Sequence, residues 1–533
     1  MQAEGRTRQL DKTNPIFVPT ESLSQRKNEG GVWICAAVLI VFAAILYMEL
    51  VSYRTFGPEF AQFYKLNVDA RLSRVWVAYS TLTKSWYRPT AFVLPYYIGQ
   101  FFIDWHNVVG WKVLNLATAL ITSLLIFWLV LVLFPGRRLA ALFAAIFFIA
   151  SPNLFIVVFE ISAFDFMYII FVLLCVIWFI QSAEAAGRRA SWLLALSVLS
   201  YGLALTSKEI SIVTPVYLGL VSLLLLWRSW SWKQWPRFAL RLLPFLLLMG
   251  LYWVGHVQNI PKSAYGDSGD YRIQPNANQI IENAIKYPVW MARVYSGVKD
   301  SMNQAACYAK WWTTVPGVLA AVLIVITWIR KAREDERYRW AALFLLGWMA
   351  VFLIVPIYSG GYLWHGNLAM VAYAVFFGVA LDDLFARIPV ERWRTVAVTG
   401  FLVAFLLFAR ASVRDFLEEN PRRFIYHLNY WILREPPVPA QQLSGPALVF
   451  YEDRLGLSSW GYGGGNNLFK YVYSNLRIEE KETPVMHQVD PGLCQIWLSR
   501  PNAYYFRYDN DLRWHNASDQ FKAECNQRLN TTQ

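Results

Sequence analysis

Long apolar runs, separated by polar connections, are the main feature of the chain. Runs such as Asn115–Phe134 and Thr395–Phe408 approach the length of about 20 mostly apolar residues that a bilayer-spanning helix needs. A helix satisfies its own backbone polar groups in hydrocarbon, and Trp and Tyr gather at the edges of these runs as interfacial anchors do. The pattern predicts an all-α polytopic membrane protein with about eleven spans, near 32–51, 109–134, 139–157, 164–182, 191–206, 209–227, 239–257, 313–330, 340–357, 366–384 and 394–410.

The connections between these spans alternate in charge. One set is rich in arginine and lysine, whereas the short connections of the other set, 152–162, 206–210 and 359–366, contain a single basic residue, Lys208. The positive-inside rule places the basic set in the cytoplasm together with the amino terminus. An odd number of spans then puts the carboxy-terminal tail on the opposite face. The basic set comprises Arg137, Arg138, Arg188, Arg189, Arg228, Lys233, Arg237, Arg241, Arg330, Lys331, Arg333, Arg337, Arg339, Arg387, Arg392 and Arg394.

The predicted domain organisation has three parts. A cytoplasmic basic tail (1–31) precedes a transmembrane domain (32–410) whose extracytoplasmic loops near 54–108 and 257–312 are long, and an extracytoplasmic domain (411–533) follows. The last part reads as a small α/β domain with strands at Ala447–Tyr451, Cys494–Leu498 and Ala503–Tyr508 and a loop at Gly461–Gly465. An oxidising compartment permits a disulfide between Cys494 and Cys525, and an unbridged pair is an equally open alternative.

Composition supports this class and excludes others. Hydrophobic residues make up 56% of the 533, and charged residues only 16%, against about a quarter in an ordinary soluble domain. The formal charge of +13 lies in the cytoplasmic connections, so we expect no nucleic-acid partner. The first 30 residues lack the apolar stretch and cleavage site of a signal peptide. No His/Cys cluster has zinc-ligand spacing, so we expect no cofactor, and dependence on a divalent metal stays open.

Charged side chains at the outer ends of spans are the candidates for chemistry, because charge near hydrocarbon is costly and commonly functional. Glu59 lies in Pro58-Glu59-Phe60-Ala61 just beyond the first span, and Tyr87-Arg88-Pro89 follows 29 positions later. Asp165 opens the fourth span, and Thr206-Ser207-Lys208-Glu209 joins the fifth span to the sixth.

This ordered set resembles the GT-C superfamily of membrane glycosyltransferases, above all the lipid A aminoarabinose transferases and the protein O-mannosyltransferase-like enzymes. The resemblance covers about residues 30–385. It is carried by an acidic residue after the first span, a basic residue followed by proline, an Asp at the fourth span and a Ser-Lys pair after the fifth. The first motif of the family usually holds one or two Asp. Here it offers Glu59, with Asp69 ten residues on, so the resemblance leaves the choice of carboxylate open.

The resemblance implies an inverting transfer of a sugar from a polyprenyl-phosphate donor. Glu59 or Asp69 would be the general base, and Asp165 would orient the acceptor or the sugar. Arg88, next to Tyr87, would contact the leaving phosphate, and Lys208, beside Glu209, would be a second cation. The alternative interpretations are a lipid-headgroup contact for Arg88, a pair with Glu209 for Lys208, and capping of the fourth span for Asp165. Weaker donor-binding candidates are Tyr362, His365 and Asn367, and His256 reads as an interfacial histidine.

The sequence therefore predicts a glycosyltransferase of the bacterial inner membrane, with a glycan, glycolipid or protein acceptor on the extracytoplasmic face. The endoplasmic reticulum is the alternative location. A transporter or flippase of lipid-linked precursors is the alternative function, although we find no internal repeat of the kind that transporters show.

Overall fold

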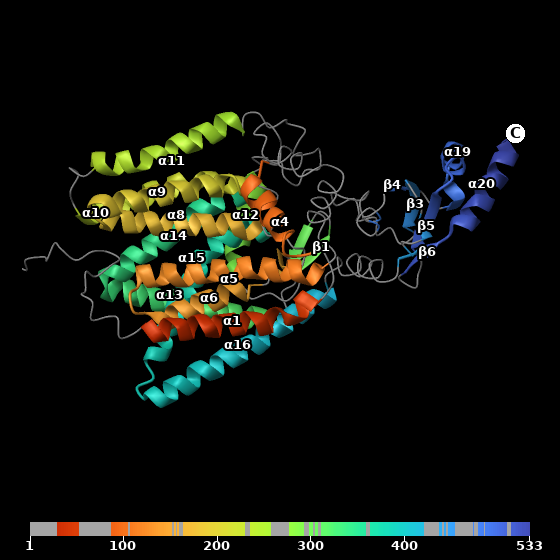
Figure 1. The fold of residues 1–533 in the computed structure, drawn as a ribbon. Coiled ribbons are helices and arrows are strands. Elements are labelled where there is room, and N and C mark those ends of the chain that lie inside the picture. The colour runs from red at the N-terminus through yellow and green to blue at the C-terminus, as the bar shows by residue number, and fades with distance from the viewer. Residues whose placement is uncertain are drawn as a thin grey trace, which may run out of the picture.

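A computed structural model of the chain shows a helical bundle and a small α/β unit (Figure 1). The structure describes residues 29–52, 87–104, 107–151, 154–155, 157–158, 164–229, 235–256, 277–292, 298–301, 304–307, 311–358, 363–419, 436–439, 442–443, 446–453, 469, 473, 478–483, 486–508 and 513–532.

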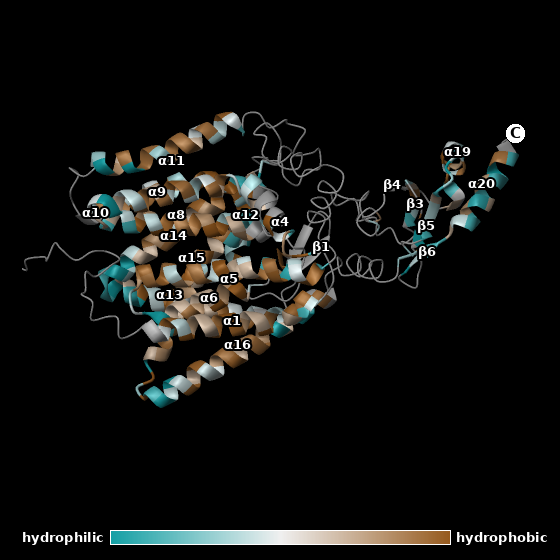
Figure 2. Cartoon of the chain, viewed as in Figure 1, coloured by the Kyte–Doolittle hydropathy of each residue, from teal (hydrophilic) through white to brown (hydrophobic). Residues whose placement is uncertain are grey.

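The bundle confirms the predicted polytopic all-α fold. Within the described residues, 9 helices are long and apolar enough to cross a membrane. Their apolar residues cover the helix bodies and their polar residues lie at the helix ends (Figure 2). These helices are α1 (Glu29–Ser52), α5 (Val108–Leu133), α8 (Phe164–Glu184), α10 (Thr214–Ser229) with the preceding turn η3 (Glu209–Val213), α11 (Trp235–Gly255), α13 (Trp311–Glu334), α14 (Glu336–Tyr358), α15 (Asn367–Ala386) and α16 (Glu391–Glu419).

The other two predicted spans form helices that do not qualify as full spans. The helix α6 (Arg138–Ile149) has 12 residues, fewer than a hydrocarbon core requires. The helix α9 (Gly187–Leu205) has 19 residues, but two arginines and three serines lower its hydropathy. Because α9 packs along α8 and α6 packs between α1, α5 and α15, both belong to the bundle.

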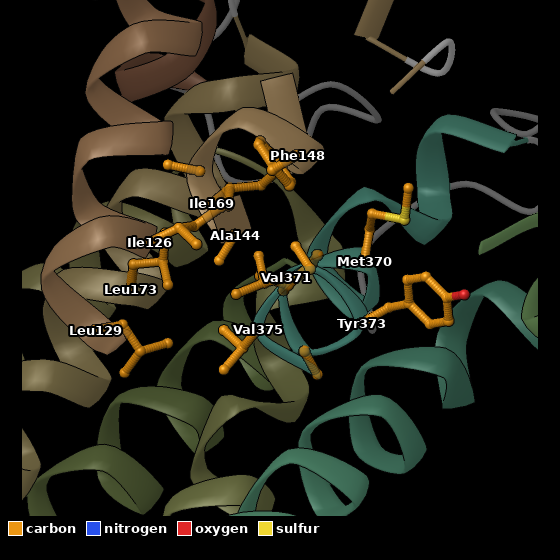
Figure 3. Packing of buried hydrophobic residues seen from close by; sticks show 14 of the residues in the cluster. Ile126, Leu129, Ala144, Phe148, Ile169, Leu173, Met370, Val371, Tyr373 and Val375 are labelled. Carbon is orange, nitrogen blue, oxygen red and sulfur yellow. The ribbon is translucent and has the colours of Figure 1, made fainter. Parts of the chain in front are cut away.

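The centre of the bundle is formed by α5, α6, α8 and α15, whose apolar side chains converge (Figure 3). Lipid is as apolar as leucine, so packing between membrane helices depends on close approach, which small residues permit. Ala140 and Ala144 of α6 face Gly378 of α15. A Cβ added at Gly378 would lie closer than 3.0 Å to backbone atoms of both alanines. The helix α15 therefore lies in the interior, and 94% of its most apolar stretch of 18 residues is buried.

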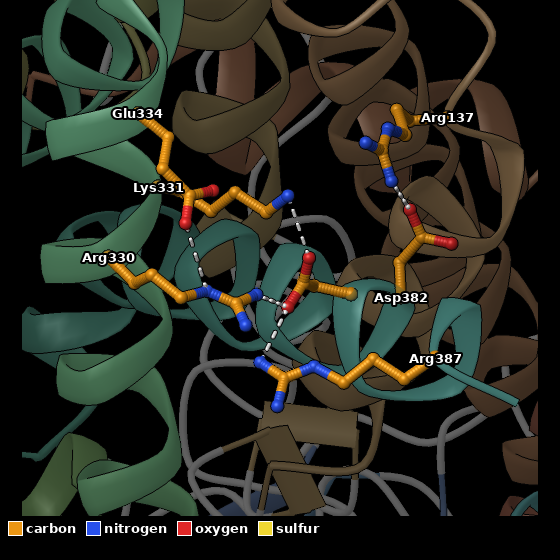
Figure 4. Close-up of polar contacts among 7 residues, drawn as sticks. Arg137, Arg330, Lys331, Glu334, Asp382 and Arg387 are labelled. Atoms are coloured by element: carbon orange, nitrogen blue, oxygen red, sulfur yellow. Dashed lines mark hydrogen bonds and ion pairs between the residues drawn. The ribbon is translucent and has the colours of Figure 1, made fainter.

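One end of the bundle holds the basic connections, and we call it the basic end, defined by Arg137, Arg330, Lys331 and Arg387. There the carboxylate of Asp383 on α15 accepts hydrogen bonds from Arg330 and Arg387 and lies 2.9 Å from Lys331 Nζ (Figure 4). The adjacent Asp382 accepts from Arg137 at 2.8 Å. These ion pairs join the connection between α5 and α6 to α15, and α13 to α15.

Shorter elements lie between the long helices. These are the π-helical turn η2 (Pro89–Val93), α4 (Leu94–Gly99), α12 (Ala277–Ala292), the antiparallel strands β1 (Val298–Ser301) and β2 (Gln304–Cys307), and the 3-10 turn η7 (Leu363–Gly366).

The carboxy-terminal unit is a four-stranded sheet in the order β4-β3-β5-β6. The central strand β3 (Ala447–Asp453) pairs in parallel with β4 (Ile478–Glu482) and β5 (Ala503–Tyr508), and β5 pairs antiparallel with β6 (Trp514–Asn516). The strands predicted at Ala447–Tyr451 and Ala503–Tyr508 are confirmed. The turn η10 (Met486–Gln488) and the helices α19 (Pro491–Leu498) and α20 (Ser518–Thr532) complete the unit.

The predicted strand at Cys494–Leu498 is wrong, because this segment belongs to α19. Asp490 caps the helix by accepting from the backbone N–H of Leu493, and Pro491 suits the first helical position. The disulfide between Cys494 and Cys525, one of the two alternatives left open by the sequence, is present and ties α19 to α20. The predicted loop at Gly461–Gly465 lies outside the described residues.

Candidate functional site

The end of the bundle opposite the basic end brings together segments that are more than 100 residues apart. The start of η2 docks on the carboxyl end of α9. The backbone N–H of Thr90 donates to the carbonyl of Thr206 at 3.1 Å, and the two threonine hydroxyls lie 2.7 Å apart. Since Thr206 ends α9 and is followed directly by Ser207-Lys208-Glu209, this docking brings Arg88 to Lys208 and Glu209. We call this end the site end.

Arg88 and Glu209 form a forked ion pair. Arg88 Nε donates to Glu209 Oε1 at 3.1 Å, and Nη2 donates to Oε2 at 2.7 Å. Their side chains are only 12% and 24% exposed, so water screens the pair weakly. A guanidinium carries five N–H donors, of which the fork to Glu209 uses two. Glu209 therefore fixes the orientation of Arg88. The carboxylate of Glu209 pairs with Arg88, not with the adjacent Lys208 as one sequence alternative held.

Lys208 is 5% exposed and directly precedes η3, with its ammonium near the amino end of α8. Its Nζ is 5.3 Å from the centre of the Tyr168 ring, an arrangement that attracts a cation to the ring face. Asp165 precedes Tyr168 by three positions in α8, so the amino end of that helix belongs to the site end. The structure describes the backbone of Asp165 at the site end but not its side chain.

Aromatic side chains and histidines complete the described part of the site. The Tyr87 ring lies 5.5 Å from the imidazole of His256, and the Tyr252 ring lies 5.1 Å from the same imidazole. Burial raises the pKa of Tyr87. His256 is 0% exposed and follows α11 directly, so it is an interior residue of the site and not the interfacial histidine that the sequence suggested. The spacing of Tyr252 and His256, one helical turn apart, is the sequence signal for their contact.

His365 in η7 belongs to the same electrostatic environment. Burial lowers the pKa of His365 well below its usual range, and the positive charges of Lys208 and Arg88 lower it further. Because both effects lower the pKa, they favour the neutral imidazole at neutral pH. A neutral imidazole carries one donor and one acceptor, which suits recognition of a hydroxyl group.

Several predicted site residues stay predictions. Glu59, Asp69 and Tyr362 lie outside the described residues, so the structure does not place the candidate bases. Within the described ranges, no group of three or more His, Cys, Asp or Glu residues is arranged to hold a metal ion. Tyr87, Arg88, Lys208, Glu209 and His365 are thus the predicted site residues whose side chains the structure brings to one place.

This arrangement suits a phosphate group. Arg88 and Lys208 provide two cations in a partly buried region, where charge-assisted hydrogen bonds are stronger than in water. The guanidinium, fixed by Glu209, offers directed donors, whereas the lysine ammonium acts as a point charge. Tyr87, His256 and His365 surround these charges with aromatic groups.

The chain was compared with known proteins. No family model matches it, and no curated protein sequence does. Among solved structures it is similar to ArnT from Cupriavidus metallidurans, determined with bound undecaprenyl phosphate. The two chains are 12% identical with a TM-score of 0.53, and the match covers 90% of this chain and 94% of ArnT.

Two further similarities are more distant. The archaeal oligosaccharyltransferase AglB from Archaeoglobus fulgidus, in complex with an inhibitory peptide and a dolichol-phosphate, is 11% identical with a TM-score of 0.48, over 92% of this chain and 74% of AglB. The S. cerevisiae protein O-mannosyltransferase Pmt1-Pmt2 complex, bound to the sugar donor, is 18% identical with a TM-score of 0.33, over 46% of this chain and 36% of its match.

The likeness to ArnT extends over the bundle and the carboxy-terminal unit alike, since it covers nearly the whole of both chains. The chain is a multi-pass membrane protein whose fold is similar to that of ArnT.

Proposed function

We propose that this protein is a membrane glycosyltransferase that transfers a sugar from a polyprenyl-phosphate donor to a hydroxyl-bearing acceptor. The observation that carries the proposal is the meeting of Arg88 and Lys208, two cations 120 positions apart in sequence, at one end of a bundle with the GT-C fold. A lipid carrier places its phosphate at the bilayer surface, so cations at the end of a membrane-spanning bundle are positioned to bind that phosphate.

The reaction breaks the bond between the anomeric carbon and the phosphate oxygen and forms a bond from that carbon to the acceptor oxygen. The acceptor loses its proton to a carboxylate, and the polyprenyl phosphate leaves with the bonding electrons. Negative charge gathers on the phosphate as the bond breaks, so Arg88 and Lys208 bind the transition state more tightly than the intact donor. Glu209 acts through Arg88 as a positioning residue.

The base is a carboxylate on the face of the sugar opposite the phosphate, which gives inversion at the anomeric carbon. We assign this role to Glu59 or Asp69, both in the segment between α1 and η2, which leads directly to Arg88. Asp165, at the amino end of α8, orients the acceptor or the sugar.

The charge pattern supports an orientation with the basic end in the cytoplasm and the site on the extracytoplasmic face. We propose the bacterial inner membrane as the location. Nucleotide sugars are confined to the cytoplasm as a rule, which favours a lipid-linked donor on the outer face. ArnT, the solved structure with the similar fold, was determined with undecaprenyl phosphate. A glycan, glycolipid or protein can be the acceptor, and membrane lipids surround the bundle.

The test is transfer of radiolabelled sugar from a panel of polyprenyl-phosphate donors by the purified protein in lipid. Glu59→Gln and Asp69→Asn identify the base, because each removes one proton acceptor while keeping the size of the side chain. We expect transfer by the wild type and its loss in one of the two variants, with thermal unfolding unchanged.

The competing function is transport of lipid-linked precursors. The transferase proposal would be overturned in favour of transport by two results together. The protein would consume no donor in the panel, and both carboxylate variants would keep full cellular function. Cellular function that survives without the carboxylates cannot depend on a base-assisted transfer.

A further inference from the structure

Several buried polar side chains at the site end have no hydrogen-bond partner in the described part of the chain. They are Ser151 after α6, Ser211 in η3, Thr214 at the start of α10 and Asn367 at the start of α15. Each is at most 4% exposed. Their positions in sequence connect them to the site, because Ser211 and Thr214 follow Lys208 closely and Asn367 follows His365 by two residues.

Three buried hydroxyls in the body of the bundle are bonded within their own helices. Thr122, Ser123 and Ser222 each donate to the carbonyl four residues earlier in their own helices. This is the usual way in which a membrane helix satisfies a hydroxyl. The groups at the site end differ from these three hydroxyls, and the difference needs an explanation.

Asn367 is the clearest case. It is 1% exposed, and neither its Nδ2 nor its Oδ1 has a partner among the described residues. A buried amide that makes none of its hydrogen bonds costs stability at both atoms. The next residue, Leu368, is held in place because its carbonyl accepts from Trp348 Nε1 at 2.6 Å, so the backbone around Asn367 is fixed.

The other buried asparagines of the bundle show how this protein satisfies an amide that has a structural role. Asn115 is 0% exposed, and its Nδ2 donates to the carbonyl of Val157 at 2.7 Å. Asn283 is 3% exposed and donates to the carbonyl of Ile357 at 3.0 Å. Both join two segments of the chain. Asn367 joins none, so it does not serve as a structural cross-link among the described residues.

The same end of α10 and α15 is linked through α14. The Trp348 ring lies 5.1 Å from the Tyr217 ring, one turn beyond Thr214, while its indole N–H bonds to the residue after Asn367. The two amino-terminal ends that carry Thr214 and Asn367 thus pack against the same tryptophan. The unpaired amide and hydroxyl belong to one region.

The chemistry of these groups selects a ligand. A phosphate is an acceptor only, and at this end the charged donors Arg88 and Lys208 serve it. An amide and hydroxyls, which both donate and accept, match neighbouring hydroxyl groups, each of which also donates and accepts. An apolar lipid tail would satisfy none of them.

We propose that Asn367 recognises a hydroxyl of the transferred sugar, its Oδ1 accepting from that hydroxyl or its Nδ2 donating to it, with Thr214 and Ser211 in the same subsite. The inference rests on the proposed function, since it assigns part of the donor to a part of that site. The amide stays unpaired in the ligand-free protein and gains its partner when the donor binds.

The test compares Asn367→Leu with Asn115→Leu, which replaces a bonded amide of the same size. Thermal unfolding is measured without donor. Transfer is then measured with the donor that the wild type uses and with analogues that each lack one sugar hydroxyl. Asn367→Ala is measured in parallel, so that a failure of the leucine variant to fold does not end the test.

We expect Asn367→Leu to unfold at or above the wild-type temperature, whereas Asn115→Leu unfolds at a lower one. We also expect the wild type to prefer the complete sugar over one of the deoxy analogues by roughly 10- to 100-fold in kcat/KM. This preference falls to about one in the Asn367 variants, because the group that reads the hydroxyl is gone.

Two results overturn the inference while leaving the proposed function intact. One is transfer by the Asn367 variants with every preference unchanged. The other is that Asn367→Leu loses as much stability as Asn115→Leu while its preferences among the sugar analogues stay unchanged. That result would show that buried water satisfies the amide of Asn367. If the wild type itself transfers no sugar from any donor, the proposed function fails as well.

Discussion

The two ends of the helical bundle both carry buried charge, but they use it differently. At the basic end, the carboxylate of Asp383 forms ion pairs with three cations, and that of Asp382 pairs with a fourth. At the site end, one carboxylate, Glu209, fixes Arg88, while Lys208 lies against an aromatic ring. At the same end, the buried side chains of Thr214 and Asn367 have no hydrogen-bond partner in the part of the chain that the structure describes.

The difference separates the charges that hold the bundle together from those that act on a ligand. Carboxylates that bring several cations from different helices together stabilise the packing of those helices. At the site end, Glu209 positions Arg88, which together with Lys208 is the proposed phosphate-binding pair. The following predictions test whether this division between the two ends is correct.

The largest effect is expected at the site end, from Arg88→Ala. Removal of a donor that stabilises charge in the transition state typically lowers catalysis by about 100- to 1000-fold, and we expect a loss of that size in kcat/KM. Arg88→Lys keeps the charge without the fork and should recover only part of the activity. Steady-state transfer assays measure both variants.

The double variant Arg88→Ala/Glu209→Gln is the control, because it removes the buried carboxylate that Arg88→Ala leaves unpaired. It should unfold at a higher temperature than Arg88→Ala yet stay equally inactive. If the double variant regains activity, Arg88 is a structural cation like those of the basic end, and the comparison fails.

A smaller effect is expected at the basic end, from Asp383→Asn. The variant should lose about 1–3 kcal/mol of stability, since three cations lose their shared counter-charge but are themselves partly exposed. Activity per folded molecule should stay within about twofold, which transfer assays on material of known folded fraction can check.

The matched control is Glu334→Gln, which touches the same Arg330. Glu334 is 57% exposed, so its removal should cost less than about 0.5 kcal/mol. Equal losses in the two variants would mean that the burial of Asp383 contributes nothing, and a large loss of activity in Asp383→Asn would link the two ends.

The smallest effect is a pH dependence at His365. Its pKa in the folded protein is lowered by burial and by Lys208 and Arg88, while the unfolded chain has the ordinary value near 6.5. Below about pH 6.5 the unfolded state binds more protons, so this group makes the protein lose stability as the pH falls. His365→Gln removes that contribution.

We therefore expect the wild type to lose more stability than His365→Gln between pH 7 and pH 5, as followed by thermal unfolding in detergent. The slope for one group is at most about 1.4 kcal/mol per pH unit. Identical pH profiles would show that His365 is not held neutral by the site. Lys208→Met should flatten the wild-type profile, since it removes one of the charges that lower this pKa.

Within the described residues, nine of the eleven predicted spans match helices long and apolar enough to cross a membrane, because length and hydropathy are local properties. Runs such as Asn115–Phe134 became helices as expected. The local pattern gave a wrong prediction where a helix cap determines the structure. Cys494–Leu498 reads as a strand by composition, but Asp490 and Pro491 begin a helix before it. The highly charged strand Ile478–Glu482 carries no strand signal, since it is an edge strand that pairs through its backbone.

The pairing of side chains could not be predicted in the same way. Glu209 is adjacent to Lys208 in sequence but bonds to Arg88, because the contact between Thr90 and Thr206 brings the distant segment against it. The unpaired state of Asn367 is likewise a property of three-dimensional packing, and no spacing along the chain signals it.

The contact of Gly378 with Ala140 and Ala144 has a consequence for how freely the sequence can vary. A hydrophobic helix in a membrane usually accepts exchange among Leu, Ile, Val and Ala, because insertion depends on summed hydropathy. At Gly378 even the methyl group of alanine would collide with the backbone of α6. Every single-residue change at this position adds at least that methyl group. In a scan of all substitutions along α15, position 378 should therefore be among the least tolerant, although its side chain takes no part in chemistry.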